Sequence, residues 1–563
     1  TANNAETQKS NIHRDSSIFV FVCFSEKNTC FFDGNSISYS HSNCKGSRVY
    51  LYTRFFNENS QLRPWIFVAN PRMEEITMYY QSTRGASAPV NSAQAVLKGL
   101  ADDGGLYMMN ELPEFDWQTC LSKDTKGMAK QILSALLPEI QPMDELVERA
   151  YTGKFESEEL TPTVKVGDFT ILELFRGPTS AFKDVALCML PQLLTAAIKS
   201  EGMEKEILIL TATSGDTGKA ALAGFADVPG VGICVFYPHG GVSAVQRAQM
   251  VTQKGKNVRV CAVEGNFDDA QTGVKNIFAA CADGKLLEGK GIELSSANSI
   301  NIGRLAPQIT YYFKAYADLL ARGEIKMGDK VNYSVPTGNF GDILAGYLAK
   351  KLGLPVGKLI CASNTNKVLS DFIHTGTYDR KRPLHKTDSP SMDILVSSNL
   401  ERLLYLLSGQ DAQLVAGLMK ELNTVGKYTV PAELKAAIDA EFWGDFADDA
   451  TTAAAIDRVW KTYGYLCDTH TAVGWHVAET YVNQTGDKTP MVVLSTASPY
   501  KFPAAVLTAI GGDTSGDEFQ QMERLSKITN VPIPGNLTGL QELPELHTGV
   551  IAKEEMLSFV LGK

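Results

Sequence analysis

The chain has 563 residues, 44% of them hydrophobic and 21% charged, and 53 basic against 63 acidic residues give it a net charge of −10. This length and composition indicate a globular protein of several domains and exclude a strongly basic nucleic-acid-binding surface. No run approaches about 18 apolar residues, so no membrane span is predicted. The ten cysteines form no CxxC pair, and five of them stand in largely apolar surroundings. This is typical of reduced thiols, so we expect a cytoplasmic protein.

Residues 1–72 differ in composition from the rest of the chain, because they hold three of the ten cysteines and twelve aromatic residues. Their apolar run, 18–24, has only the minimum length of a signal-peptide core, and no small-residue cleavage site follows it. Five acidic residues argue against a transit peptide. We interpret 1–72 as an atypical extension that arose from cloning, gene modelling or upstream translation. A true extension or a targeting segment is the alternative.

Residues 73–165 are expected to form an N-terminal domain of mixed helices and strands, with apolar residues at helical spacing in 116–137 and 143–151. From residue 166 onward, buried strands alternate with helices. The predicted strands are 206–213, 232–237, 257–263, 330–335 and 358–363, and the helices after the first four are 217–226, 243–253, 268–282 and 341–352. Such alternation indicates parallel sheets covered by helices.

A charged segment rich in Leu and Ala, 375–465, interrupts this pattern and is expected to be a mainly helical insertion. A buried strand at 491–495 and a helix at 502–510 then resume it. We therefore expect an α/β protein whose core, 166–374 and 466–563, forms two parallel-sheet lobes with a cleft between them.

Lys183 stands among small and apolar residues, in the run Gly177-Pro178-Thr179-Ser180-Ala181-Phe182-Lys183-Asp184. If its side chain is buried there, the neutral amine is favoured, as nucleophilic attack on carbonyl groups requires. A surface lysine at the start of a helix is the alternative that the local sequence leaves open.

Three further segments directly follow predicted buried strands, where α/β sheets bind ligands. They are Ser214-Gly215-Asp216-Thr217-Gly218, Gly338-Asn339-Phe340-Gly341-Asp342 and Thr496-Ala497-Ser498-Pro499-Tyr500-Lys501-Phe502. Glycines let the backbone approach an anion, and the N-terminus of the next helix supplies a positive dipole end. Plain strand-to-helix turns are the alternative for all three segments.

A fourth segment, Ser296-Ala297-Asn298-Ser299-Ile300-Asn301-Ile302-Gly303-Arg304, is unusually polar and passes into an apolar helix. Arginine suits phosphate through its planar fork of donors, and a structural salt bridge is the alternative for Arg304. His470, in Asp468-Thr469-His470-Thr471, is either a structural hydrogen-bonder or a participant in chemistry. There is no HExxH, CxxC, Walker or GxGxxG motif, so no metal is expected.

Taken in order, these segments resemble threonine synthases, over about 73–563. Threonine synthases are pyridoxal-phosphate-dependent enzymes of fold type II, similar to the β chain of tryptophan synthase. The resemblance implies that 73–165 is the family's N-terminal domain and that the two α/β lobes are the catalytic core. It also implies that pyridoxal 5'-phosphate is the cofactor and that Lys183 is its catalytic Schiff-base lysine.

The resemblance further implies which residues surround Lys183. The cofactor would be bound by Lys183, Asp216, Gly338, Asn339, Phe340, Gly341, Asp342 and Thr496. The substrate would be bound by Ser214, Thr217, Ser299, Asn301 and Arg304. Many related enzymes have Asn where Asp216 stands, and the Asp here agrees with threonine synthases.

The implied reaction converts O-phospho-L-homoserine and water to L-threonine and phosphate. Two alternatives stay open: a related phospho-amino-acid lyase that releases a keto acid, ammonia and phosphate, and an inactive, cofactor-binding regulatory protein. The expected partner is a small-molecule substrate, with no nucleic acid and no membrane, and the expected assembly is a monomer or homodimer.

Overall fold

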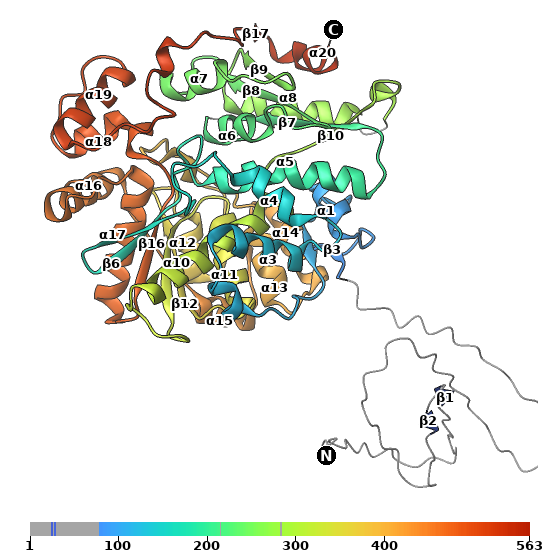
Figure 1. Cartoon of the computed structure of the whole chain (residues 1–563), viewed down its shortest axis with the longest axis horizontal. Coiled ribbons are helices and arrows are strands. Elements are labelled where there is room, and N and C mark those ends of the chain that lie inside the picture. The colour runs from blue at the N-terminus through green and yellow to red at the C-terminus, as the bar shows by residue number, and fades with distance from the viewer. Residues whose placement is uncertain (1–23, 26–27, 30–77, 214, 282–283, 563) are drawn as a thin grey trace, which may run out of the picture. The chain divides into compact units, whose positions relative to one another are not determined.

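The computed structural model describes residues 24–25, 28–29, 78–213, 215–281 and 284–562 (Figure 1). The chain divides into two units, Thr1–Thr77 and Met78–Lys563. In the first unit, strand β1 (Phe24–Ser25) pairs antiparallel with β2 (Asn28–Thr29). The rest of the extension predicted at 1–72 lies outside the described residues, and its origin stays a prediction.

The second unit contains two large sheets (Figure 1). One has the strand order β10-β7-β8-β9-β17, with all neighbours parallel. Its strands are β10 (Ile292–Ser295), β7 (Glu206–Ala212), β8 (Val231–Pro238), β9 (Val258–Val263) and β17 (Val550–Ile551). Every residue of β8 is buried, as expected for a central strand covered on both faces.

The other sheet has the order β15-β12-β11-β16-β6-β5, and all its described pairs are parallel except β6 with β5. Its strands are β15 (Phe442–Phe446), β12 (Val356–Ser363), β11 (Val331–Pro336), β16 (Met491–Ser495), β6 (Phe169–Glu173) and β5 (Thr163–Val166). The predicted α/β class with two parallel-sheet lobes is confirmed.

Helices cover these sheets. The longest is α5 (Lys183–Ser200), which packs against α6 (Asp216–Phe225), α1 (Ser92–Lys98) and α4 (Met143–Tyr151) (Figure 1). Most of α5 is buried on all sides, because its sequence is apolar all round. It starts at Lys183, so this lysine lies at the end of a buried helix. Among the described residues, no helix is long and apolar enough to cross a bilayer.

The N-terminal part departs from one prediction. The single helix expected at 116–137 is two helices, α2 (Trp117–Leu121) and α3 (Thr125–Leu136). Asp124 lies between them in extended conformation and accepts a hydrogen bond from Gly127 N at 2.8 Å. This N-cap starts a new helix inside a continuous apolar pattern. The same part also contains the antiparallel pair of β3 (Tyr80–Ser82) and β4 (Tyr107–Met109).

The segment 375–465 contains four complete α-helices: α13 (Leu400–Leu407), α14 (Ala412–Thr424), α15 (Ala432–Glu441) and α16 (Asp449–Tyr463). It also contains the antiparallel pair β13 (Thr377–Asp379) and β14 (Lys427–Thr429). Its last strand, β15, pairs with β12 at the edge of the six-stranded sheet. This segment therefore supplies part of the core sheet as well as helices.

Candidate active site

Lys183 is held at the junction of α5 and the end of β16. Phe182 N donates to Thr496 O at 2.8 Å, and Ser498 N donates to Ser180 O at 3.1 Å. Ser180 has a positive φ of 56°, which lets the chain turn sharply just before the helix. Two of the predicted segments, 177–184 and 496–502, are thus joined by backbone hydrogen bonds. Thr496 makes this connection through its backbone carbonyl, not through its side chain.

The Lys183 amine is nearly buried, with a side chain 13% exposed. Its Nζ lies 3.4 Å from Ser391 Oγ and 3.9 Å from Asp216 Oδ2. Burial lowers the pKa of Lys183 to about 8, because the charged form loses hydration, although the nearby Asp216 carboxylate opposes the shift. The amine is therefore far more often unprotonated near neutral pH than an ordinary lysine, as a nucleophile or base requires.

Asp216 is the first residue of α6, and its carboxylate lies between lysines. Lys501 pairs with Oδ1, and Gln246 Nε2 donates to the same oxygen at 3.1 Å. Burial alone would raise the pKa of Asp216, but Lys501, Lys183 and Lys219 together hold it well below its ordinary value. Asp216 is therefore a fixed negative charge beside Lys183. Thr217, next in the chain, is partly exposed, and Ser214 lies outside the described residues.

The predicted phosphate loop joins β11 to α11 (Gly341–Lys351). Phe340 has φ 61° and ψ 5° at the N-cap of α11, and no side chain caps that end. Uncapped N–H groups at a helix N-terminus favour an anion. Asn339 O accepts from Asn399 N at 3.0 Å, and Gly338 O accepts from Ser397 Oγ at 2.8 Å, so the loop is held by the segment after η3 (Pro390–Met392).

Gly341→Ala should weaken cofactor binding at least about tenfold while the protein keeps its melting temperature. An added Cβ would meet no protein atom closer than Asn399 Nδ2 at 3.4 Å, so only a bound phosphate is obstructed. Titration by absorbance measures the affinity. Gly338→Ala is the contrasting variant, because its Cβ would lie 2.7 Å from the Ser391 carbonyl and should lower the melting temperature. Unchanged affinity in Gly341→Ala would mean that the loop is only a turn.

Asp342, in the first turn of α11, is a buried carboxyl group. It accepts from Tyr311 Oη at 2.6 Å and Tyr312 Oη at 3.1 Å, while its Oδ2 has no partner among the described residues. Burial raises the pKa of Asp342 to about 7, although the two tyrosine hydrogen bonds oppose this. Near neutral pH this group is partly protonated and can donate as well as accept a hydrogen bond.

Asp342→Asn should change how stability depends on pH. In the unfolded chain this carboxyl titrates near 4. Its protonated folded form therefore stabilises the protein fully below about pH 4, and this contribution is lost as the pH rises through 7. The melting temperature of the native chain, relative to the variant, should fall between pH 5 and pH 8. Thermal melts of both proteins without added cofactor test this, and parallel curves would contradict the raised pKa.

The predicted substrate segment separates into residues with different surroundings. Arg304, in α9 (Ile302–Leu305), is 3% exposed, and its Nη1 donates to Ala297 O at 2.6 Å. Its Nε has no partner, and no carboxylate pairs with it among the residues the structure describes. Burial lowers the pKa of Arg304 to about 10, and its charge acts on Lys183. A buried, incompletely partnered guanidinium fits an anionic ligand better than a structural salt bridge.

Asn301 is used inside the protein. It is 0% exposed, its Nδ2 donates to Val96 O at 2.9 Å, and its Oδ1 caps α9 by accepting from Gly303 N at 2.8 Å. A substrate could reach this amide only if the surrounding chain moved. Ser299 is partly buried, and its carbonyl accepts from Asn399 Nδ2 at 3.2 Å. Of the three candidates in this segment, Arg304 is the one with a buried donor that has no partner among the described residues.

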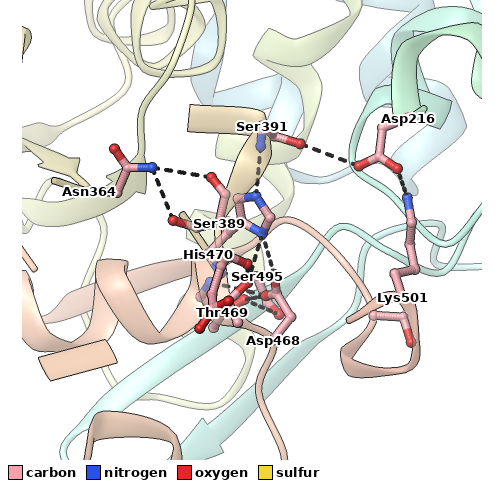
Figure 2. A network of polar contacts seen from close by, with 12 residues as sticks. Asp216, Asn364, Ser389, Ser391, Asp468, Thr469, His470, Ser495 and Lys501 are labelled. Atoms are coloured by element: carbon pink, nitrogen blue, oxygen red, sulfur yellow. Dashed lines mark hydrogen bonds and ion pairs between the residues drawn. The ribbon is translucent and has the colours of Figure 1, made fainter. Parts of the chain in front are cut away.

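Two side chains at the site, Lys501 and Ser391, were not among the predicted site residues, and a third, His470, was left open between a structural and a chemical role (Figure 2). Lys501 is fully buried against Asp216. A lysine within the apolar turn 499–502 was a usable signal for it. Ser391 carried no comparable signal, because serines are common in the chain around 389–398.

Known proteins match this chain along most of its described length. Residues 79–151 match the family model of the threonine synthase N terminus, 150–418 that of pyridoxal-phosphate dependent enzymes, and 471–556 that of the threonine synthase C-terminal region. Threonine synthase of Pseudomonas aeruginosa is 40% identical over 466 residues, which cover 80% of this chain and 96% of that protein. Human threonine synthase-like 1 is 40% identical over 438 residues, 74% of this chain, and the match spans only 58% of that protein's length.

The fold agrees with these matches. The crystal structure of threonine synthase from Brucella melitensis with bound pyridoxal phosphate superimposes with a TM-score of 0.76 at 38% identity. The match covers 86% of this chain and 99% of that one.

The residues present fit that cofactor. A buried lysine with a lowered pKa suits an aldehyde, and the uncapped N-terminus of α11 suits a phosphate. The chain belongs to the threonine synthase family of pyridoxal-phosphate-dependent enzymes, and pyridoxal phosphate is its cofactor.

Proposed function

We propose that the protein is a threonine synthase, which converts O-phospho-L-homoserine and water to L-threonine and phosphate. The observation that carries this proposal is Arg304, a buried guanidinium whose Nε has no partner among the described residues and whose charge acts on Lys183. The N-terminus of α11 offers a first anion site, for the cofactor phosphate. Arg304 offers a second, and a substrate that carries its own phosphate needs one.

When bound, pyridoxal phosphate supplies an electron sink for negative charge that develops on the substrate carbons. Lys183 would hold the cofactor, with Gly338, Asn339, Phe340 and Gly341 around the phosphate. Asp216 and Thr496 would lie toward the ring, and Asp342 adjoins the loop. Each of these assignments is part of the proposal, as is the division of the chain into an extension, an N-terminal domain, a two-lobed core and the segment 375–465.

The protein's own groups would move the protons. Lys183 Nζ, once free, would take the proton from the substrate's Cα, for which its lowered pKa suits it. Overall, the bond between Cγ and the phosphate oxygen breaks, one proton leaves Cβ and one is placed at Cγ, the hydroxyl group of water is placed at Cβ while its proton goes to the leaving phosphate, and the Cα proton is returned. Arg304 would hold the leaving phosphate through charge-assisted hydrogen bonds. Asp216, which Lys501 keeps in the carboxylate form, would stabilise the positive charge that develops on Lys183 Nζ when it takes the proton from Cα.

Product analysis with O-phospho-L-homoserine tests this function. Threonine and phosphate in equal amounts support it. The related lyase would release 2-oxobutyrate, ammonia and phosphate instead. An inactive regulatory protein would bind the cofactor and release no phosphate. We propose action on this small molecule in the cytoplasm, by a monomer or a homodimer, and the same preparation analysed by size-exclusion chromatography with light scattering gives the assembly.

A further inference from the structure

Ser391 contacts two parts of the site at once, and a third lies against its carbonyl. Figure 2 shows its contacts with Asp216 and His470. Its Oγ lies 3.4 Å from Lys183 Nζ and 3.3 Å from Asp216 Oδ2. Its carbonyl oxygen occupies the space beside Gly338, where a Cβ would come within 2.7 Å. Ser391 therefore lies between the reactive lysine, its negative partner and the phosphate loop, although it is 208 residues from Lys183 in the sequence.

The hydrogen bonds of Ser391 have a fixed direction. Asp216 is a carboxylate and can only accept, so the Ser391 hydroxyl donates its hydrogen to Oδ2. The lone pairs of Oγ are then left facing Lys183 Nζ. Asp216 itself is 3.9 Å from Nζ, beyond hydrogen-bonding distance. Ser391 is therefore the group that connects the amine to the carboxylate.

His470 sets the position of Ser391. Its Nε2 accepts from Ser391 N at 3.2 Å, and its Nδ1 lies 2.7 Å from Asp468 Oδ2. Asp468 is fully buried and also accepts from His470 N at 2.9 Å and Thr471 N at 3.0 Å. These contacts assign the hydrogen to Nδ1 and leave Nε2 as the acceptor that the Ser391 N–H needs.

A second connection ties the same two segments together. Thr469 Oγ1 donates to Asp388 O at 2.7 Å, three residues before Ser391. Asp468 is also the N-cap of α17 (Thr469–Thr485), a helix packed on β11, β12 and β16 of the six-stranded sheet. The start of α17 therefore fixes the segment of Ser391 relative to the core through two contacts, the Thr469 hydroxyl with the Asp388 carbonyl and the His470 ring with Ser391 N.

We propose that Ser391 is a further catalytic residue, which accepts a hydrogen bond from Lys183 Nζ and links it to Asp216, and that His470, held by Asp468, is its positioning residue. This inference rests on the proposed function only in that Lys183 is the cofactor lysine. It assigns a task to the Asp468–His470 pair, which contacts neither Lys183 nor the phosphate loop directly in the described structure.

The test compares holoenzymes of Ser391→Ala, Ser391→Thr, His470→Ala and the double variant Ser391→Ala/His470→Ala with the native chain. The first readout is the pH midpoint of the bound cofactor's absorbance, which reports protonation at Lys183 Nζ. The second is the rate of phosphate release. Ser389→Ala is the matched control. Ser389 lies two residues away in the same segment, and its hydroxyl meets Asn364 Nδ2 at 3.1 Å instead of Lys183.

Ser391→Ala should lower the pH midpoint by about half a unit or more, because the protonated nitrogen loses an acceptor. It should also slow phosphate release about tenfold or more. Ser391→Thr, which keeps a hydroxyl, should stay within about threefold of native, and Ser389→Ala should keep the native midpoint. His470→Ala should reproduce the shift, and the double variant should show no more than Ser391→Ala alone, since both changes remove one interaction.

A native midpoint in Ser391→Ala, or an equal shift in Ser389→Ala, would overturn the role of Ser391. Additive effects in the double variant would overturn the role of His470. The midpoint does not depend on which substrate is used. If the native protein made no threonine but the midpoint shifted as expected, the proposed reaction would fail and the role of Ser391 would stand.

Discussion

Lys183→Ala is expected to abolish threonine formation, by more than about a thousandfold, while the fold stays intact. The amine that carries the chemistry is lost. The cost to stability should be small, because burial already disfavours the Lys183 charge and Asp216 keeps Lys501 as its partner. Steady-state assays measure the loss, and the melting temperature, compared with that of the native chain without added cofactor, measures the fold.

Borohydride reduction followed by peptide mass spectrometry shows which lysine holds the cofactor. The site contains two other lysines that could hold the cofactor, because Lys219 and Lys501 are also buried and act electrostatically on the same carboxylate, Asp216. Burial also lowers the pKa of Lys219, so a low pKa alone does not single out Lys183. Lys219 Nζ, however, donates to Thr179 O, and Lys501 is paired with Asp216. Cofactor found on either of these lysines would refute the assignment.

Arg304→Ala is expected to reduce kcat/KM for O-phospho-L-homoserine by about tenfold to more than a hundredfold, with cofactor binding little changed. The loss of one charge-assisted hydrogen bond corresponds to roughly 1.5–3 kcal/mol. Cofactor binding should change little because Arg304 lies in α9, whereas the cofactor phosphate is assigned to the N-terminus of α11. Steady-state kinetics and a cofactor titration on the same preparation separate the two effects.

Arg402→Ala is the matched control for Arg304. Arg402 is also a fully buried arginine, but it donates to Tyr107 O at 3.0 Å, to Asn399 Oδ1 at 2.5 Å and to Ile300 O at 2.6 Å. Its removal leaves these acceptors unpaired and should lower the melting temperature more than Arg304→Ala does. If Arg304→Ala kept a normal kcat/KM and lost as much thermal stability as Arg402→Ala, Arg304 would be a structural residue.

The sequence by itself determined the fold class, the family and the place of the reactive lysine. Strand β8 and its neighbours are mostly apolar, and apolar residues recur at helical spacing in the helices between them, so local periodicity is enough to predict parallel sheets. Lys183 was identified from its neighbours in the chain, and its side chain is only 13% exposed.

Features that depend on contacts between distant segments were decided only by the tertiary structure. Strand β15 has an alternating, half-buried pattern and was included in a helical segment, because the sequence does not show that β12 is its partner. Asn301 and Arg304 share one polar segment. The Asn301 amide is hydrogen-bonded to Val96 and caps α9, whereas the Arg304 Nε has no partner among the described residues. Burial and partner choice separate them, and neither is a local property.

The same reason explains the residues that sequence reasoning missed. Ser391 meets Lys183 and Asp216 across separations of 208 and 175 residues, and Lys501 meets Asp216 across 285. A serine has no distinctive local pattern when its role comes from a partner on another strand or helix, and the local pattern around a lysine does not show which carboxylate it will meet. The sequence placed the chemical groups on the chain, and the packing of α5, α6, α17 and the two sheets brought them within hydrogen-bonding distance, because burial of those apolar surfaces fixes which polar groups meet.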